Sequence, residues 1–168
     1  MDQTIKNSIL KNAKMSENKF LIFSLENEIY GAEILKVREI IGLHPITRVP
    51  KMSEHIKGVI NLRGKVIPVI DLRLRFEMEE IDYTDRTCII VVEVGAKATE
   101  TVIGIVVDAV SEVLNIKKED IEETPAFGTQ LDTAYILGMA KMEGGVKILL
   151  DIDTVLSTVS LSHIHQAA

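Results

Sequence analysis

The chain has 168 residues, of which 46% are hydrophobic and 26% are charged, and its formal net charge is −6. This length fits one domain or two small lobes that share a core, and the composition is that of a globular protein. The apolar runs at 88–92 and 102–107 are far shorter than the roughly 20 residues of a membrane-spanning helix. They also exclude a secretory signal peptide. The single cysteine, Cys88, cannot form an intrachain disulfide or a thiolate zinc site, so we expect a buried cysteine in a cytoplasmic protein.

Charge is divided unevenly along the chain. Residues 1–76 hold 13 Lys and Arg against 8 Asp and Glu, whereas residues 77–168 hold 6 against 17. A nucleic-acid-binding protein needs a concentrated basic surface, and the acidic half would repel phosphate. The division therefore favours protein partners over nucleic acid. Two solvated faces that serve only solubility would give the same distribution of charge.

The residue preferences predict a mainly β fold. The chain has 23 Ile and 16 Val against 15 Leu, and β-branched side chains pack well on a pleated sheet. Two short helices are expected where an Asp that can cap the helix begins an apolar turn. A mobile N-terminal arm over 1–18 and a C-terminal tail over 161–168 are expected at the ends. The predicted strands are 20–25, 86–94, 101–107 and 146–150, and the predicted helices are 71–76 and 151–159.

Two motifs occur twice in the chain, which indicates an internal duplication. The first reads Gly31-x2-Ile34-x2-Val37-x-Glu39-Ile40 and then Gly104-x2-Val107-x2-Val110-x-Glu112-Val113. The second reads Gly58-x5-Gly64-x2-Ile67-x2-Ile70-Asp71-Leu72 and then Gly138-x5-Gly144-x2-Lys147-x2-Leu150-Asp151-Ile152. We therefore predict two similar β-rich lobes, at about 20–76 and 88–157. Because a lobe of roughly 60 residues is marginal alone, the two should pack together and leave a groove between them.

The sequence contains no recognisable catalytic, cofactor or metal motif. A phosphate-binding loop, a dinucleotide fingerprint and a zinc-protease motif are all missing. The best metal candidate, His163-x-His165, lies at the C-terminus, where a solvated tail is the simpler interpretation. We expect no cofactor, no metal and no enzyme activity, although sequence alone leaves open a catalytic pair among the many carboxylates.

The segment 56–76 predicts a strand, a tight turn, a second strand and a capped helix. Gly64 permits the positive φ of the turn, and Pro68, which has no N–H to donate, should place the second strand at an edge or a bulge. Arg63 would then lie at the tip of the turn, where its guanidinium suits a fixed carboxylate partner. A plain solvent-exposed arginine explains the same pattern.

The same segment, with GVINLRG followed by IPVIDLR, resembles the CheW family of bacterial chemotaxis adaptor proteins. The resemblance extends over nearly the whole chain and includes Phe20-Leu-Ile-Phe and the two copies of the first repeated motif. It implies one domain over 19–160, built from two similar five-stranded SH3-like β-barrel subdomains. Whether the subdomains exchange their terminal strands stays open. It also implies a non-catalytic protein that couples methyl-accepting chemoreceptors to the regulatory domain of the histidine kinase CheA, assembles into rings, and does not insert into the membrane itself.

The resemblance also implies which residues bind the partners. The receptor's helical hairpin tip would lie in the groove between the lobes, with Glu39 and Arg63 as an ion pair on its wall. The kinase would bind at the barrel ends, with Phe127 as a loop anchor. Core packing explains the apolar members equally well. The candidate receptor-binding residues are Val37, Glu39, Ile40, Arg63, Gly64, Gly104, Val110 and Val113.

Three other interpretations remain. A β-barrel that binds nucleic acid would need interleaved basic and aromatic residues, but the chain has no Trp and only seven Phe and Tyr. An enzyme of unknown type lacks a motif to support it. A CheW-like module that serves another two-component signalling pathway, or that is part of a larger signalling protein, is the closest alternative.

Overall fold

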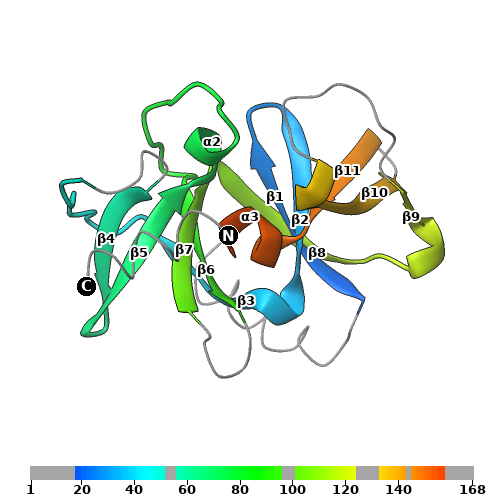
Figure 1. Cartoon of the computed structure of the whole chain (residues 1–168). Helices are drawn as coiled ribbons and strands as arrows, with labels where there is room; N and C mark the ends of the chain where they lie inside the picture. The colour runs from blue at the N-terminus through cyan, green and yellow to red at the C-terminus, as the bar shows by residue number, and fades with distance from the viewer. Residues whose placement is uncertain (1–17, 52–55, 96–100, 124–132, 143–144, 158–168) are drawn as a thin grey trace.

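The computed structural model describes residues 18–51, 56–95, 101–123, 133–142 and 145–157. Two twisted sheets lie side by side, and only short helices accompany them (Figure 1). The predicted mainly β fold is therefore confirmed. The N-terminal arm, the C-terminal tail and Phe127 fall outside the described residues.

One sheet has five strands and the other has six. The five-stranded sheet has the order β3 (Val37–Gly42), β6 (Cys88–Val94), β7 (Thr101–Val107), β5 (Lys65–Asp71) and β4 (Ile56–Leu62). The six-stranded sheet has the order β8 (Ala109–Asn115), β1 (Lys19–Leu25), β2 (Glu28–Glu33), β11 (Gly145–Leu150), β10 (Ile136–Met142) and β9 (Ile121–Glu122). The short helical segments are η1 (Ile34–Lys36), α2 (Leu72–Arg75), η2 (Lys118–Asp120), η3 (Thr133–Tyr135) and α3 (Ile152–Ser157).

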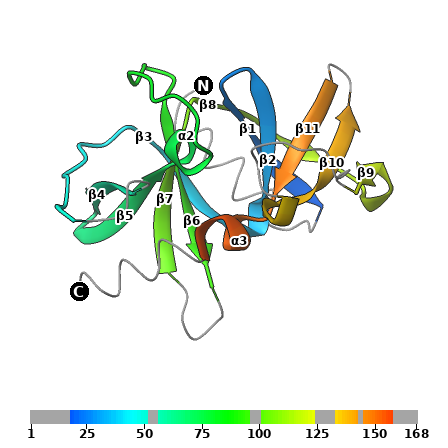
Figure 2. The same ribbon diagram turned by 45° about the horizontal axis from the view of Figure 1, so that its top comes forward.

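The sheets do not follow the two halves of the sequence. Strands β1 and β2 of the first half join β8–β11, whereas β6 and β7 of the second half join β3–β5. Two parallel ladders, β5 with β7 and β2 with β11, hold the exchanged strands. The exchange of strands that the sequence left open is thus present, and it involves the first two strands of each half. Figure 2 shows the same arrangement with α3 lying between the sheets.

The repeated motifs occupy equivalent places in the two sheets. Replacing each strand of β3-β6-β7-β5-β4 by its counterpart in the other half yields β8-β1-β2-β11-β10, which is the observed order. The parallel ladders agree in register, because Gly104 lies opposite Val69 and Gly31 lies opposite Leu149. The chain therefore has an internal twofold relation, and β9 is an addition to one side.

The predicted caps and turns are confirmed, with one exception. The Asp71 carboxylate accepts the Arg73 amide at 3.0 Å and begins α2, and Asp151 accepts the Thr154 amide at 3.3 Å in the first turn of α3. Cys88 is buried. Of the two positions predicted for Pro68, the edge is wrong, because β5 lies between β4 and β7, whereas the β4–β5 ladder does shift register close by, opposite Val69 and Ile70. The ladder of β5 with β7 begins only at Val69, so Pro68 needs no N–H on that side. On the other side it lies opposite Val59, whose N–H and C=O are bonded to Thr47.

The largest hydrophobic core is shared by the two sheets. It contains Phe23 and Tyr30 from the six-stranded sheet and Ile90 and Val92 from the five-stranded sheet. Aromatic rings continue from Phe23 through Tyr30 and Phe76 to Tyr135, with successive ring centroids 5.9 to 6.3 Å apart. Because these contacts join both sheets, we expect the sheets to stabilise one another.

Candidate partner-binding surfaces

Arg63 and Gly64 form the two-residue turn of the β4–β5 hairpin. Both have positive φ, 49° at Arg63 and 87° at Gly64, as a turn that matches the twist of the strands requires. The Gly64 amide donates to the Asn61 Oδ1 atom at 2.8 Å, which fixes the turn further. The predicted tight turn is therefore confirmed, and it holds the Arg63 side chain out from the sheet, with 69% of it exposed.

The predicted ion pair between Glu39 and Arg63 is present. Arg63 Nη2 lies 2.7 Å from Glu39 Oε1, and the Glu39 side chain is only 19% exposed. Glu39 is on β3 and Arg63 follows β4, which are the two edge strands of the five-stranded sheet. In a flat sheet these edges would be about 19 Å apart, so the sheet curls until its edges approach. The pair holds an exposed cation in one place, which suits recognition better than folding.

The other candidate receptor-binding residues are buried or partly buried in the structure. Val37 and Ile40 are 0% and 2% exposed and belong to the shared core. Gly104 is buried within β7. Val110 and Val113, on β8, are partly buried against the same core. The burial of Val37 and Ile40 favours the core-packing alternative for these two residues, and a receptor contact of any of the five stays a prediction.

An exposed apolar residue beside the hairpin tip was not predicted. Val66, two residues after Gly64, is 70% exposed. Its counterpart in the second repeat, Val146 on β11, is 49% exposed. The pattern of the β4–β5 hairpin would have indicated this position, because Val66 is the outward residue between Lys65 and the buried Ile67.

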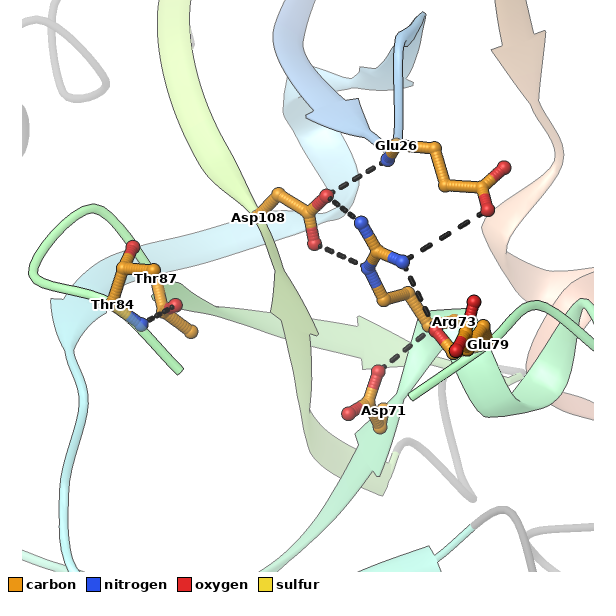
Figure 3. Close-up of polar contacts among 7 residues, drawn as sticks. All are labelled: Glu26, Asp71, Arg73, Glu79, Thr84, Thr87 and Asp108. Atoms are coloured by element: carbon orange, nitrogen blue, oxygen red, sulfur yellow. Dashed lines mark hydrogen bonds and ion pairs between the residues drawn. The ribbon is translucent and has the colours of Figure 1, made fainter. Parts of the chain in front are cut away.

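A buried ion pair joins the two sheets. Arg73, on α2 beside the five-stranded sheet, donates from Nε to Asp108 Oδ1 at 2.8 Å and from Nη2 to Asp108 Oδ2 at 2.6 Å (Figure 3). The backbone amide of Glu26, in the turn between β1 and β2, donates to Asp108 Oδ2 at 2.8 Å. Arg73 Nη1 also donates to the Glu79 carbonyl at 3.0 Å. The hydrogen bond to Asp108 raises the pKa of Arg73, so this cation stays charged.

Arg75 makes a second contact between the sheets. Its Nε donates to the Val155 carbonyl of α3 at 3.0 Å, its Nη2 donates to the Tyr135 hydroxyl, and its guanidinium lies 4.9 Å from the centre of the Tyr135 ring. Sequence analysis assigned no role to Arg73, Arg75 or Asp108. The LRLR sequence of α2 shows two arginines two residues apart. It gives no signal for their acceptors on the other sheet and on α3, which lie 35 to 80 residues away.

The segment after α2 packs over the buried end of β5. Tyr83 donates from its hydroxyl to Asp71 Oδ2 at 3.0 Å, and Lys57 lies 5.5 Å from the centre of the Tyr83 ring and pairs with Glu80. Burial raises the pKa of Asp71 above its usual value, and burial together with the nearby Asp71 charge raises the pKa of Tyr83. The hydrogen bond from Lys57 lowers the pKa of Glu80. These groups attach the segment to the five-stranded sheet.

Two hollows in the described part of the molecule differ in the charge of their linings. One of about 510 Å³ is lined mainly by basic and apolar residues beside β4: Arg48, Val49, Pro50, Lys51, Ile56, Lys57, Leu74 and Glu80. The other, of about 360 Å³, has an apolar floor and a largely acidic rim at the β9 end of the six-stranded sheet: Asn18, Phe20, Glu33, Ile116, Lys118, Ile121, Glu122, Glu123 and Leu137. Glu123, the last described residue before position 124, is part of the lining of the second hollow.

Within the described ranges, no cluster of three or more His, Cys, Asp or Glu is arranged to hold a metal ion. The same residues contain no helix with the length and apolar character needed to span a membrane. His163 and His165 fall outside them.

Comparison with known proteins identifies relatives along almost the whole chain. The family model described as "CheW-like domain" matches residues 19–160. The chain is 41% identical over 150 residues to a chemotaxis protein CheW of Klebsiella aerogenes, covering 89% of this chain and 88% of the relative. It is 34% identical over 143 residues to a chemotaxis protein CheW of Bacillus subtilis, covering 84% and 88%. The crystal structure of the scaffolding protein TtCheW from Thermoanaerobacter tengcongensis is similar with a TM-score of 0.75 and 37% identity, covering 85% and 90%.

Proposed function

This chain belongs to the CheW family of chemotaxis scaffold proteins, and from that premise we propose that it is a non-catalytic adaptor between chemoreceptors and the kinase CheA. In this role it is a cytoplasmic protein recruited to receptor arrays at the membrane. It binds the hairpin tip of a methyl-accepting receptor on one surface and the regulatory domain of CheA on another, and it self-associates within the array.

The observation that carries the proposal is the fixed cation at the β4–β5 turn. Arg63 is exposed, yet the turn and Glu39 hold it in one orientation. A guanidinium fixed in this way binds a carboxylate with little further loss of side-chain freedom. Val66 adds an exposed apolar side chain beside it. This combination of one fixed charge and one apolar contact suits an amphipathic helix, such as one arm of a receptor hairpin.

The acidic hollow at the β9 end supports a separate surface for the kinase. Its floor is apolar, with Phe20 and Ile121, and Leu137 is 44% exposed at its edge. A hollow with an apolar floor and a charged rim resembles the centre of a protein interface. We assign it, together with Phe127, to the regulatory domain of CheA.

The receptor surface is tested by reversing the charge at the tip. Arg63→Glu should weaken binding of a receptor hairpin fragment by more than about tenfold, because like charges then face one another. The free energy of unfolding should fall by no more than about 1 kcal/mol, since an exposed pair contributes little to stability. Calorimetric titration measures the first quantity and urea denaturation the second. The double variant Glu39→Arg/Arg63→Glu restores the ion pair but not the exposed cation at the turn. It should fold and should still bind the receptor fragment weakly. Receptor binding by folded Arg63→Glu at the level of the parent chain would refute this assignment.

The kinase surface is tested by placing a charge at the second hollow. Leu137→Arg should abolish binding of the CheA regulatory domain and leave receptor binding unchanged, whereas Arg63→Glu should do the reverse. Leu35→Arg, at another exposed leucine, is the matched control and should leave kinase binding intact. If the folded parent chain binds neither partner, a CheW-like module in another two-component pathway becomes the better description.

A further inference from the structure

The exchange of strands requires the chain to pass between the sheets at two equivalent points. At the first crossing, Asp108 connects β7 of the five-stranded sheet to β8 of the six-stranded sheet. At the second crossing, η1 connects β2 of the six-stranded sheet to β3 of the five-stranded sheet. The repeat that begins at Gly31 and Gly104 places Leu35 and Lys36 at the positions of Asp108 and Ala109. The internal twofold relation therefore connects the two crossings.

Each crossing forms an ion pair with a short helix, the first with α2 and the second with α3, and the two pairs have opposite polarity. At the first crossing the acid is on the crossing and the base, Arg73, is on α2. At the second, the base, Lys36, is on the crossing, and its Nζ lies 2.6 Å from Oδ2 of Asp153 on α3. Arg73 and Asp153 are themselves equivalent in the second repeated motif.

The hydrogen bonds around the two carboxylates are also equivalent. The amide of Glu26, in the β1–β2 turn, donates to Asp108, and the amide of Gly95, after β6, donates to Asp153 Oδ1 at 3.1 Å. Each carboxylate thus accepts one hydrogen bond from the end of a β-hairpin and an ion-pair contact from a base. The same arrangement occurs at both crossings, with the acid on the crossing at Asp108 and on the helix at Asp153.

The two pairs differ in strength. The Arg73 and Asp108 side chains are 10% and 20% exposed, and two hydrogen bonds join them. The Lys36 and Asp153 side chains are 34% and 35% exposed and share one contact. Bidentate, poorly solvated pairs fix geometry much better than half-exposed single contacts. The first crossing is therefore the rigid one.

We propose that Arg73 and Asp108 are positioning residues that set the orientation of β8, and of the six-stranded sheet, against the five-stranded sheet. Strand β8 begins directly after Asp108 and carries Val110 and Val113, which pack against the core shared by the two sheets. The two hydrogen bonds between Arg73 and Asp108 therefore set where Val110 and Val113, the partly buried receptor-binding candidates on β8, lie relative to Arg63 of the five-stranded sheet. The receptor part of this inference rests on the proposed function.

The orientation is tested by a distance measurement between the sheets. Spin labels are attached at Val66→Cys on β5 and Val146→Cys on β11, two exposed and equivalent positions, in a Cys88→Ala background. Arg73→Met should broaden or shift the distance distribution measured by pulsed electron paramagnetic resonance. Lys36→Met, the matched control at the weaker crossing, should change it much less. If Arg73→Met does not fold, Arg73→Lys, which keeps the charge but loses the two-point contact, replaces it.

The consequence for binding is tested without the labels. Arg73→Met should weaken binding of the receptor hairpin by between about 2-fold and 30-fold, as expected of a residue that acts through its neighbours. Binding of the CheA regulatory domain, at the far end of the six-stranded sheet, should be unchanged. The variant Arg73→Asp/Asp108→Lys copies the polarity of the second crossing into the first and should recover part of the loss.

Each outcome has a distinct meaning. An unchanged distance distribution in folded Arg73→Met overturns the positioning role. A changed distribution with receptor binding intact overturns the connection to the receptor. If the parent chain itself does not bind the receptor hairpin, the proposed function fails, and the distances alone then decide whether this pair sets the orientation of the sheets.

Discussion

At the scale of single residues, Asp71 accepts two structural hydrogen bonds in a buried position. Its carboxylate begins α2, accepts the Tyr83 hydroxyl, and is only 2% exposed as a residue. Burial disfavours the charged form, which raises the pKa of this group in the folded chain. The proton is therefore bound more tightly in the folded state than in the unfolded state.

This shift predicts a dependence of stability on pH. The contribution of Asp71 is fully present below its unfolded pKa of about 3.9 and is lost as the pH rises through the higher folded pKa. Asp71→Asn keeps a cap acceptor but does not titrate. The free energy of unfolding of the parent chain minus that of Asp71→Asn should therefore be larger at pH 4 than at pH 7, as measured by urea denaturation at each pH. A difference that stays constant across this range would contradict the shift.

The fate of the candidate site residues shows what sequence can predict at this scale. The resemblance to the family implied an ion pair between Glu39 and Arg63, and the Arg63-Gly64 sequence by itself predicted a tight turn. Both predictions are confirmed. The exposure of Val37 and Ile40 could not be predicted from the sequence, because the alternation of apolar residues along a strand is the same whether they face a core or a groove. The partners of Arg73 are fixed by the folded chain and have no local signal.

At the scale of elements, the two repeated glycines mark the parallel ladders. A Cβ atom built at Gly31 would lie 2.8 Å from Leu149 Cδ2, and one at Gly104 would lie 2.8 Å from Ile89 Cγ2. The Leu149 atom is the far end of a flexible side chain, whereas the Ile89 atom is attached directly to a branched Cβ. The strand on which each glycine lies is thus held close to its neighbours because the glycine has no side chain.

These contacts predict unequal effects of the same substitution. Gly104→Ala should lower the free energy of unfolding by about 1 to 3 kcal/mol, the usual range for overpacking. Gly31→Ala should cost less, because Leu149 can change its rotamer. Urea denaturation of both variants measures the difference. A larger loss at Gly31 than at Gly104 would mean that Leu149 yields less to an added methyl group than Ile89 does.

The elements themselves were predictable where the pattern is local. The strands and the two Asp-capped helices follow from β-branched runs and cap residues, and they occur at β1, β6, β7, β11, α2 and α3. The place of Pro68 was not predictable, because whether β5 is an edge depends on β7, a strand more than 30 residues away. Pro68, which has no N–H to donate, lies just before the start of the β5–β7 ladder rather than on an edge strand of the sheet.

At the scale of the whole molecule, neither half of the sequence contains a complete sheet. Each sheet needs strands from both halves, and the largest core draws on both sheets. The repeat predicted two lobes but could not predict which strands each lobe contains, because equivalent strands have equivalent patterns.

This topology predicts the behaviour of fragments. The chains 1–86 and 87–168 should each be largely unfolded alone, since each exposes the parallel ladder that the other must fill. Mixed together, they should regain β structure, which circular dichroism detects, with a 1:1 stoichiometry from calorimetric titration. A fragment that folds alone with a cooperative unfolding transition would show that the exchange of strands is not required.

The twofold relation also bears on how many different surfaces the molecule can present. Two separate copies of a half-length chain, exchanging strands in this manner, would form a symmetric homodimer whose faces are identical in pairs. Joining the copies in one polypeptide removes that constraint, because each copy can then change independently. The first copy of the second repeated motif has Arg63 before its second glycine, and the second copy has Glu143 at the corresponding position of the sequence. A covalently joined dimer of this kind can bind unlike neighbours on its two faces, which a symmetric homodimer cannot do.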